Sequence, residues 1–172
     1  MSTRILKEIR SLQSSPPPGV VFVSNEHTQS LLAEIAGSES TPYVGKYFLV
    51  RLRFPSDFPR SPPTAVFETP IFHPNISPTG DVCVNTLKRD WTSETTISHV
   101  LQTILCLLIE PFPESALNET AAKLALEDYN EYFRRAQLHS KVHARSSSVR
   151  EANQDGGKQK ARPVKRKTLS RL

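Results

Sequence analysis

Residues 47–54 are the stretch that decides the fold class, and they read Tyr-Phe-Leu-Val-Arg-Leu-Arg-Phe. The second half of this stretch alternates apolar and charged side chains, which is typical of an antiparallel strand with one face in water. Short apolar runs bounded by turn residues predict three more strands, at 19–24, 31–35 and 65–68. The stretch therefore belongs to a predicted four-stranded antiparallel sheet.

Helices are predicted on both sides of these strands. Apolar residues recur at helical spacing from Ile5 to Leu12, and three prolines at 16–18 end that helix. The run from Ile97 to Leu108 is apolar nearly all round, so we expect it to be a buried helix. Asn118 is a candidate N-cap for a last helical stretch, whose side chains facing the body would be Leu124, Tyr129, Tyr132, Phe133 and Leu138. Strands grouped before helices predict an α+β domain.

The net charge of +5 is unevenly distributed along the chain. Residues 145–172 hold nine basic and two acidic residues, which leaves residues 1–144 slightly acidic. The same segment contains serine and glycine runs and few large apolar side chains, so it buries too little surface to offset the entropy of ordering. We therefore divide the chain into a folded body, 1–144, and a disordered basic tail, 145–172.

The cysteine content and the lack of long apolar runs indicate where the protein works. Two cysteines without a disulfide framework favour a reducing compartment. No apolar run reaches the length of about 18 residues that a membrane span needs, and the first residues lack a signal-peptide core. We expect a soluble cytoplasmic and nuclear protein, with the basic run Lys165-Arg166-Lys167 as a candidate nuclear-import patch.

The two cysteines lie in different sequence environments. Residues 73–83 read His-Pro-Asn-Ile-Ser-Pro-Thr-Gly-Asp-Val-Cys, and their prolines and glycine predict an irregular segment that presents Cys83 as a nucleophile. Cys106 lies within the apolar run 103–109, so we expect it to be a buried structural thiol.

In this order and spacing, the motifs resemble the ubiquitin-conjugating enzyme family. The residues that carry the resemblance are the strand 47–54, Pro62-Pro63, His73-Pro74-Asn75, Cys83, Trp91 and Pro111-x-Pro113. The match covers roughly residues 4–140 and implies the ubiquitin-conjugating (UBC) fold. Segments 83–91 and 113–119 are most similar to the chain-elongating S-type members that work with the anaphase-promoting complex, and the end Leu169-Ser170-Arg171-Leu172 is similar to theirs.

The resemblance implies a thioester mechanism. Cys83 would accept ubiquitin from an activating enzyme that consumes ATP and then pass it to a lysine amine, so this chain would bind no cofactor itself. Asn75 is the family's residue for stabilising the developing oxyanion, and it is equally consistent with a turn residue that bonds its own loop. We expect His73, with Pro74, to fix this loop rather than act as a base.

Ser115 stands where many family members place an aspartate opposite the cysteine. A serine can position the incoming lysine amine, but it contributes no charge and accepts no proton from it. The sequence therefore leaves the source of lysine activation open between Glu114, Glu119 and a carboxylate supplied by the acceptor protein.

The resemblance also implies partner surfaces. The activating enzyme would contact Arg4, Lys7 and Arg10, although a solvated helix face explains these residues equally well. The ligase would dock on Phe58, Pro59, Arg60, Pro62, Trp91 and Ser93. Arg60 and Glu94 replace the apolar and small residues common there, which weakens ordinary docking. This change favours recruitment through the tail, with Arg171 and Leu172 as its anchor and the anaphase-promoting complex as the ligase.

Other functions fit the sequence less well. A papain-like protease needs a cysteine that opens a helix, and that signature is absent. A non-catalytic ubiquitin-binding adaptor with the same fold would lack the thiol. A nucleic-acid-binding adaptor is suggested by the tail alone, where no aromatic residue is interleaved with the basic ones. His139 and His143 have helical spacing, but no thiol or carboxylate cluster joins them, so we expect a solvated helix face rather than a metal site. We also expect no membrane partner.

Overall fold

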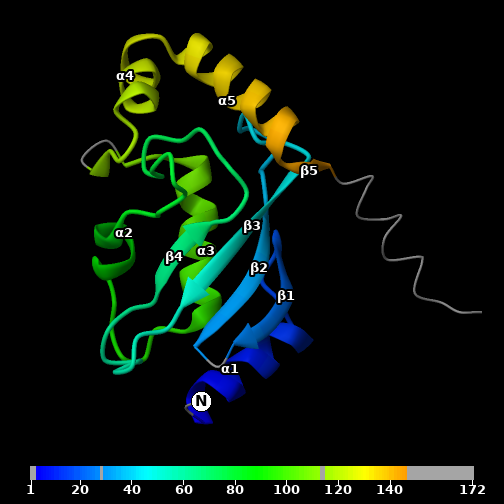
Figure 1. The fold of residues 1–172 in the computed structure, drawn as a ribbon, viewed down its shortest axis with the longest axis vertical. Coiled ribbons are helices and arrows are strands. Elements are labelled where there is room, and N and C mark those ends of the chain that lie inside the picture. The colour runs from blue at the N-terminus through cyan, green and yellow to red at the C-terminus, as the bar shows by residue number, and fades with distance from the viewer. Residues whose placement is uncertain (1–2, 28, 113–114, 147–172) are drawn as a thin grey trace, which may run out of the picture.

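The computed structural model describes residues 3–27, 29–112 and 115–146 (Figure 1). Its helices are α1 (Thr3–Ser14), α2 (Val84–Lys88), α3 (Ile97–Ile109), α4 (Glu119–Glu127) and α5 (Tyr129–His143). Its strands are β1 (Val20–His27), β2 (Ser30–Ala36), β3 (Lys46–Arg53), β4 (Thr64–Phe67) and β5 (Arg145–Ser146). The first four strands form an antiparallel sheet in the order β1-β2-β3-β4. The predicted α+β class and its four strands are confirmed.

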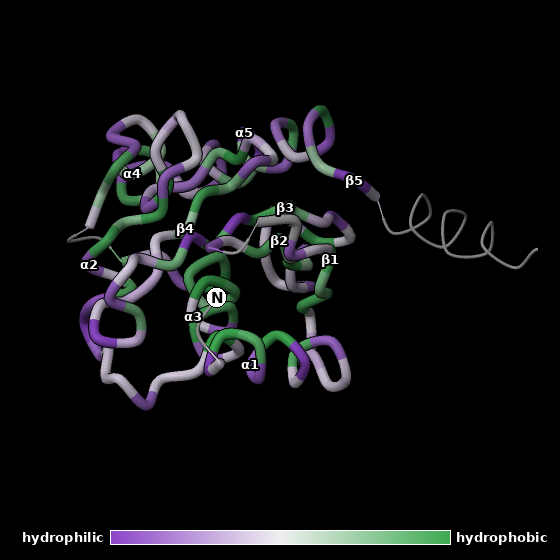
Figure 2. Tube along the Cα trace, turned by 60° about the horizontal axis from the view of Figure 1, so that its bottom comes forward, coloured by the Kyte–Doolittle hydropathy of each residue, from purple (hydrophilic) through white to green (hydrophobic). Residues whose placement is uncertain are grey.

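The core lies between one face of this sheet and helices α1 and α3. Strand β3 shows the alternation that its sequence predicted, because Phe48, Val50 and Leu52 are fully buried while the residues between them are half-buried. Helix α1 adds Ile5, Ile9 and Leu12 to the same core. Figure 2 shows α3 as the most continuously hydrophobic helix, in the middle of the molecule.

The two cysteines differ in burial, and Cys106 is not the buried one. Cys106 is exposed, whereas Cys83 is buried, with 7% of its surface accessible. Among the described residues, one side of α3 is packed, and its buried residues are Ile97, Val100, Leu101, Ile104, Leu107 and Leu108. Cys106 and Ile109 lie on the opposite side. The prediction that Cys106 is a buried structural thiol is wrong, because an apolar composition does not guarantee a packing partner on every face of a helix.

Strand β5 extends the folded body past the boundary that the charge distribution indicated. Arg145 pairs with Tyr47 and Ser146 with Lys46, on the part of β3 that β4 does not reach. Side chains reinforce this pairing: Lys46 Nζ donates to Ser146 Oγ at 2.8 Å, and Arg145 forms an ion pair with the buried carboxylate of Glu34. The first two residues assigned to the tail thus belong to the sheet. The rest of the tail, 147–172, including the proposed anchor of Arg171 and Leu172, lies outside the described residues.

The last helical stretch is two helices rather than one. Asn118 caps α4 as predicted, because its side chain accepts a hydrogen bond from Ala121 N at 3.1 Å. Asp128 ends α4 and caps α5. The buried residues of α5 are Tyr132, Ala136 and Ser140, whereas Tyr129 and Leu138 are more than half exposed. The prediction that these last two residues face the body is therefore wrong. Within the described ranges, no helix combines the length and the apolar character needed to cross a bilayer.

Candidate active site

The segment from His73 to Cys83 folds back on itself, so that Cys83 lies beside Asn75. Isolated bridges join His73 to Ile76 and Ile76 to Val82. Gly80 makes the turn with φ of +96°, and a Cβ there would lie 2.2 Å from Phe67 O, so only glycine fits. Cys83 N then donates to Asn75 O at 3.3 Å. As predicted, this segment is irregular, and it places the thiol beside the His73-Pro74-Asn75 motif.

Cys83 itself directly precedes a helix. It is the N-cap residue of α2, a helix of five residues that Thr86 and Leu87 anchor in the interior. The prediction that Cys83 lies in a loop and does not open a helix, which weighed against a cysteine protease, is therefore wrong. A single helical turn is too short for the periodicity of apolar residues to reveal it.

The Asn75 side chain is fully buried and joins the Cys83 segment to the chain beyond α3. Its Nδ2 donates to Phe112 O at 2.6 Å and to Ser115 O at 2.9 Å, while its Oδ1 accepts from Phe112 N at 2.8 Å. Pro74 O accepts from the backbone of Leu117 and Asn118 at 2.8 and 3.0 Å. The motif thus holds the segment after α3 against the cysteine loop. In this structure the side-chain amide of Asn75 hydrogen-bonds the backbone of that segment, which is a structural role.

His73 has both ring nitrogens occupied inside the protein. Nε2 donates to Leu107 O at 2.9 Å, and Nδ1 accepts from Asn75 N at 3.0 Å. These partners define the tautomer, since a carbonyl only accepts and an amide N–H only donates. Burial lowers the pKa of His73 to about 4, so the ring is neutral at pH 7. A neutral, fully engaged imidazole fixes the loop and has no nitrogen available to act as a base.

The buried His73 makes stability depend on pH. Its pKa is about 4 in the folded protein and about 6.5 in the unfolded chain, so its contribution is complete above pH 6.5 and is lost as pH falls towards 4. We expect the free energy of unfolding to fall by about 3 kcal/mol across this window, since one pKa unit corresponds to about 1.4 kcal/mol. Urea denaturation at several pH values measures this loss. A His73→Gln variant should lose less stability over the window than the wild type, and equal losses would contradict the assignment.

An open groove of about 360 Å³ lies between α2 and the segment after α3. It is lined by Asn85, Thr86, Lys88, Arg89, Phe112 and Ser115. The Arg89 guanidinium lies over the Phe112 ring, 5.7 Å from its centroid. Ser115 therefore lines one groove together with residues of α2, the helix that directly follows Cys83. Sequence reasoning did not select Asn85, Lys88, Arg89 or Phe112, because no local pattern marks them. Pro113 and Glu114 lie outside the described residues.

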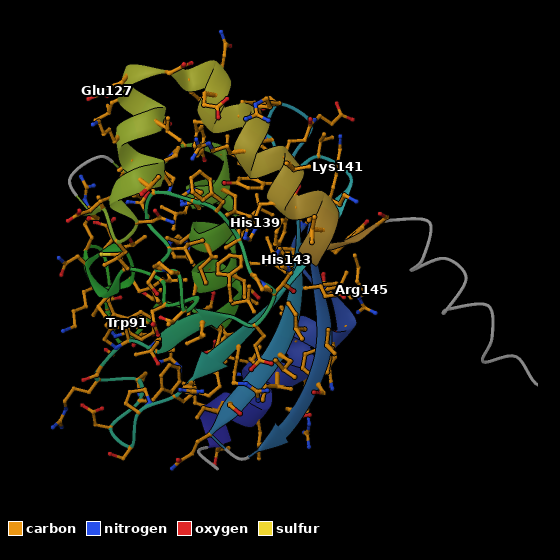
Figure 3. The ribbon with its side chains drawn as sticks, turned by 45° about the horizontal axis from the view of Figure 1, so that its top comes forward. Trp91, Glu127, His139, Lys141, His143 and Arg145 are labelled. Atoms are coloured by element: carbon orange, nitrogen blue, oxygen red, sulfur yellow. The ribbon has the colours of Figure 1, made fainter. Side chains whose placement is uncertain are left out.

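Two loops that are far apart in sequence meet around Trp91. Phe58 packs between Phe54 and Trp91, at ring-centroid distances of 5.1 and 5.9 Å. Trp91 Nε1 donates to Pro59 O at 3.1 Å. The open groove that results is lined by Asp57, Pro59, Arg60, Trp91, Thr92 and Ser93. Pro62 is half-buried, and Arg60, Ser93 and Glu94 are exposed. Figure 3 shows Trp91 on the side of the molecule away from Arg145.

The basic residues of α1 do not share one environment. Lys7 and Arg10 are exposed, as a contact face or a solvated face requires. Arg4 instead bonds to backbone oxygens just before α3. Within the described part of the chain, the exposed cations of the expected basic face are therefore Lys7 and Arg10.

His139 and His143 lie on α5 with ring centroids 4.4 Å apart (Figure 3). His139 is half-buried against Phe72, so the prediction that it lies on a solvated helix face is wrong. Burial, and to a lesser degree the neighbouring His143, lowers the pKa of His139. In the part of the chain that the structure describes, no three His, Cys, Asp or Glu side chains gather as a metal-binding set.

The fold and the cysteine loop define the class of protein. The sequence model of the ubiquitin-conjugating enzymes matches residues 4–140, which is most of the chain and includes every element from α1 to α4. The chain therefore belongs to the ubiquitin-conjugating enzyme family and is a transferase of the ubiquitination pathway.

Several of the similar proteins within this family are ubiquitin-conjugating enzymes named E2 S. Ubiquitin-conjugating enzyme E2 S-A of Xenopus laevis is 51% identical over 156 residues, which cover 88% of this chain and 70% of that protein. Human ubiquitin-conjugating enzyme E2 S is 51% identical over 140 residues, and Arabidopsis thaliana ubiquitin-conjugating enzyme E2 22 is 49% identical over 143 residues. The matches cover 81% and 83% of this chain, but only 63% and 57% of those two proteins, less than two thirds of each.

Proposed function

We propose that the protein accepts ubiquitin on Cys83 as a thioester and transfers it to a lysine of ubiquitin, so that chains grow. The observation that carries this proposal is the position of Cys83, whose backbone N–H donates to Asn75 O and which directly precedes α2, the helix that lines one side of the open groove. The similarity to the S-type relatives supports chain elongation as the outcome.

Two acyl transfers make up the proposed reaction. The Cys83 thiolate attacks the thioester carbonyl carried by the activating enzyme, a new C–S bond forms, and the activating enzyme's thiolate leaves. An acceptor amine then attacks the Cys83 thioester, loses a proton and expels the Cys83 thiolate, which leaves an isopeptide bond. ATP is consumed upstream by the activating enzyme, and neither step needs a cofactor on this chain.

The groove beside Cys83 suggests how the acceptor lysine loses its proton. Its lining includes the cations Lys88 and Arg89, and none of the lining residues in the described part of the chain is acidic. Nearby positive charge and partial desolvation both lower the pKa of an incoming ammonium group. Ser115 positions the amine without accepting its proton, so we propose that a carboxylate of the acceptor ubiquitin completes the site.

A charging assay tests the proposal. The full chain is incubated with activating enzyme, ATP and ubiquitin, and its mass is measured with and without reductant. A mass gain of one ubiquitin that reductant removes supports the proposed function. Failure to charge, under conditions that charge a control ubiquitin-conjugating enzyme, would favour the alternative, a non-catalytic adaptor of the same fold.

We also propose that the basic tail recruits the ligase, with the anaphase-promoting complex as the candidate. A flexible tether raises the effective concentration of the body at the ligase without a large rigid interface. Because β5 includes Ser146, the test truncation ends there and keeps the sheet intact. We expect thioester formation to persist while ligase-dependent chain building falls at least about tenfold.

Removal of Leu172 alone separates an anchor from a general charge effect. If Leu172 is an anchor, this single deletion should cause most of the loss of ligase-dependent chain building. If the tail acts through its charge, the deletion should cause little loss, and added salt should strongly weaken ligase-dependent activity. Nucleic-acid binding is the rival use of the same residues. If truncation leaves ligase-dependent activity unchanged and abolishes retention on DNA, the recruitment role is wrong.

A further inference from the structure

The side chain of Arg4 connects helix α1 to the loop that precedes α3. Its Nε donates to Glu8 Oε1 at 2.8 Å, and its Nη2 donates to Thr95 O at 3.2 Å. Nη1 donates to the carbonyl of Ser93. One guanidinium thus bonds to its own helix and to two carbonyls about 90 positions away. With 28% of its side chain accessible, Arg4 is largely withdrawn from solvent.

Glu8 completes the same connection at the start of α3. Its Oε2 accepts from Ile97 N at 2.5 Å, and the side chain is 14% accessible. The first amides of a helix have no partner within the helix. Thr96 supplies one partner, since its Oγ1 accepts from His99 N at 3.1 Å. Glu8 supplies another from a different helix, and its negative charge suits the positive end of α3.

The loop held by Arg4 carries part of the groove around Trp91. Thr92 and Thr95 close it, because Thr95 N donates to Thr92 O at 3.0 Å and Thr92 N donates to Thr95 Oγ1 at 3.1 Å. Trp91 fixes one side of the loop to Pro59. Arg4 fixes the other side through the carbonyls of Ser93 and Thr95. The loop therefore lies between two attachments, and one of them comes from α1.

We propose that Arg4 and Glu8 are positioning residues for the Trp91–Glu94 loop, and that Arg4 is not a contact for the activating enzyme. This inference rests on the proposed function, in which that loop is part of the ligase-docking surface. Helix α1 then has two roles on two faces: Lys7 and Arg10 are free to meet the activating enzyme, while Arg4 and Glu8 hold the loop. The planar fork of arginine suits this task, because a lysine ammonium cannot bond the carboxylate and both carbonyls in the same geometry.

The test measures the loop and the charging reaction separately in the full chain. Glu8→Gln replaces a charged acceptor with a neutral one, and Arg4→Lys keeps the charge but loses the fork. We expect the Ile97 amide to exchange with solvent roughly tenfold faster in Glu8→Gln, since hydrogen bonds to charged groups are the stronger ones. Both variants should shift the emission of Trp91, which is the only tryptophan of the sequence and so reports this loop directly.

Charging kinetics then separate positioning from partner contact. Lys7→Ala is the matched control, because it removes an exposed cation from the same helix. We expect Lys7→Ala to raise the KM for the activating enzyme, and Arg4→Ala and Glu8→Gln to leave it unchanged. An Arg4→Ala variant that raises KM as much as Lys7→Ala would overturn the proposal. So would unaltered exchange and fluorescence in Glu8→Gln and Arg4→Lys. Hydrogen exchange and fluorescence test the positioning role of Arg4 and Glu8 even if the wild type does not accept ubiquitin. Failure of the proposed function and failure of this positioning role can therefore be told apart.

Discussion

Replacing Cys83 by alanine is expected to abolish thioester formation with ubiquitin, whereas Cys106→Ser is expected to leave it intact. The thiolate of Cys83 is the proposed nucleophile, and alanine offers no atom that could hold the acyl group. The measurement is the reducible mass gain after incubation with activating enzyme, ATP and ubiquitin.

Cys106 is a demanding control because it is the more exposed of the two thiols. If exposure alone decided which thiol reacts, Cys106 would be charged and Cys83 would not. What distinguishes Cys83 is its place beside the Asn75 loops and the groove, not its accessibility. A Cys83→Ala protein that still forms a reducible adduct, lost on further change of Cys106, would show the assignment to be wrong.

Asn75→Ala is expected to slow transfer from the Cys83 thioester to lysine by about 10²–10³, the usual cost of losing one oxyanion donor. Charging of Cys83 should be affected much less. The variant should also be less stable, by about 1–3 kcal/mol, because Phe112 N and the partly buried carbonyls of Phe112 and Ser115 lose their partner. Single-turnover discharge of preformed thioester, alongside urea denaturation, measures both effects.

Asn75→Asp removes both donor roles of this side chain together and keeps only its acceptor role. Aspartate keeps an acceptor for Phe112 N but donates to neither the loop carbonyls nor an oxyanion, and its charge repels the developing oxyanion. In the structure both Nδ2 bonds go to Phe112 O and Ser115 O. Direct oxyanion stabilisation therefore requires one of these bonds to open during the reaction. If Asn75→Ala impairs charging and discharge equally, the residue acts through the loops alone.

The local sequence was sufficient for the long helices, the four main strands and the site motif, but not for the short elements α2 and β5. Alternation in 47–54 predicted β3 with the correct buried residues, and Asn118 was identified as the cap of α4. Fixed spacing around Cys83 indicated the family that the sequence model then matched. These features depend on residues close together in the chain, where backbone preferences, turn chemistry and periodicity act directly.

The sequence determined the α+β class, the positions of α1, α3 and the four main strands, and the cysteine loop, because each is encoded by neighbouring residues. Tertiary structure alone decided which thiol is buried, since Cys106 lies on the outer face of α3, which the described residues leave exposed there. It also decided that Asn75 holds Phe112 and that β5 completes the edge of β3. Arg4 meets Ser93 for the same reason: α1 packs against α3, and a contact between residues 89 positions apart exists only once both helices share one core.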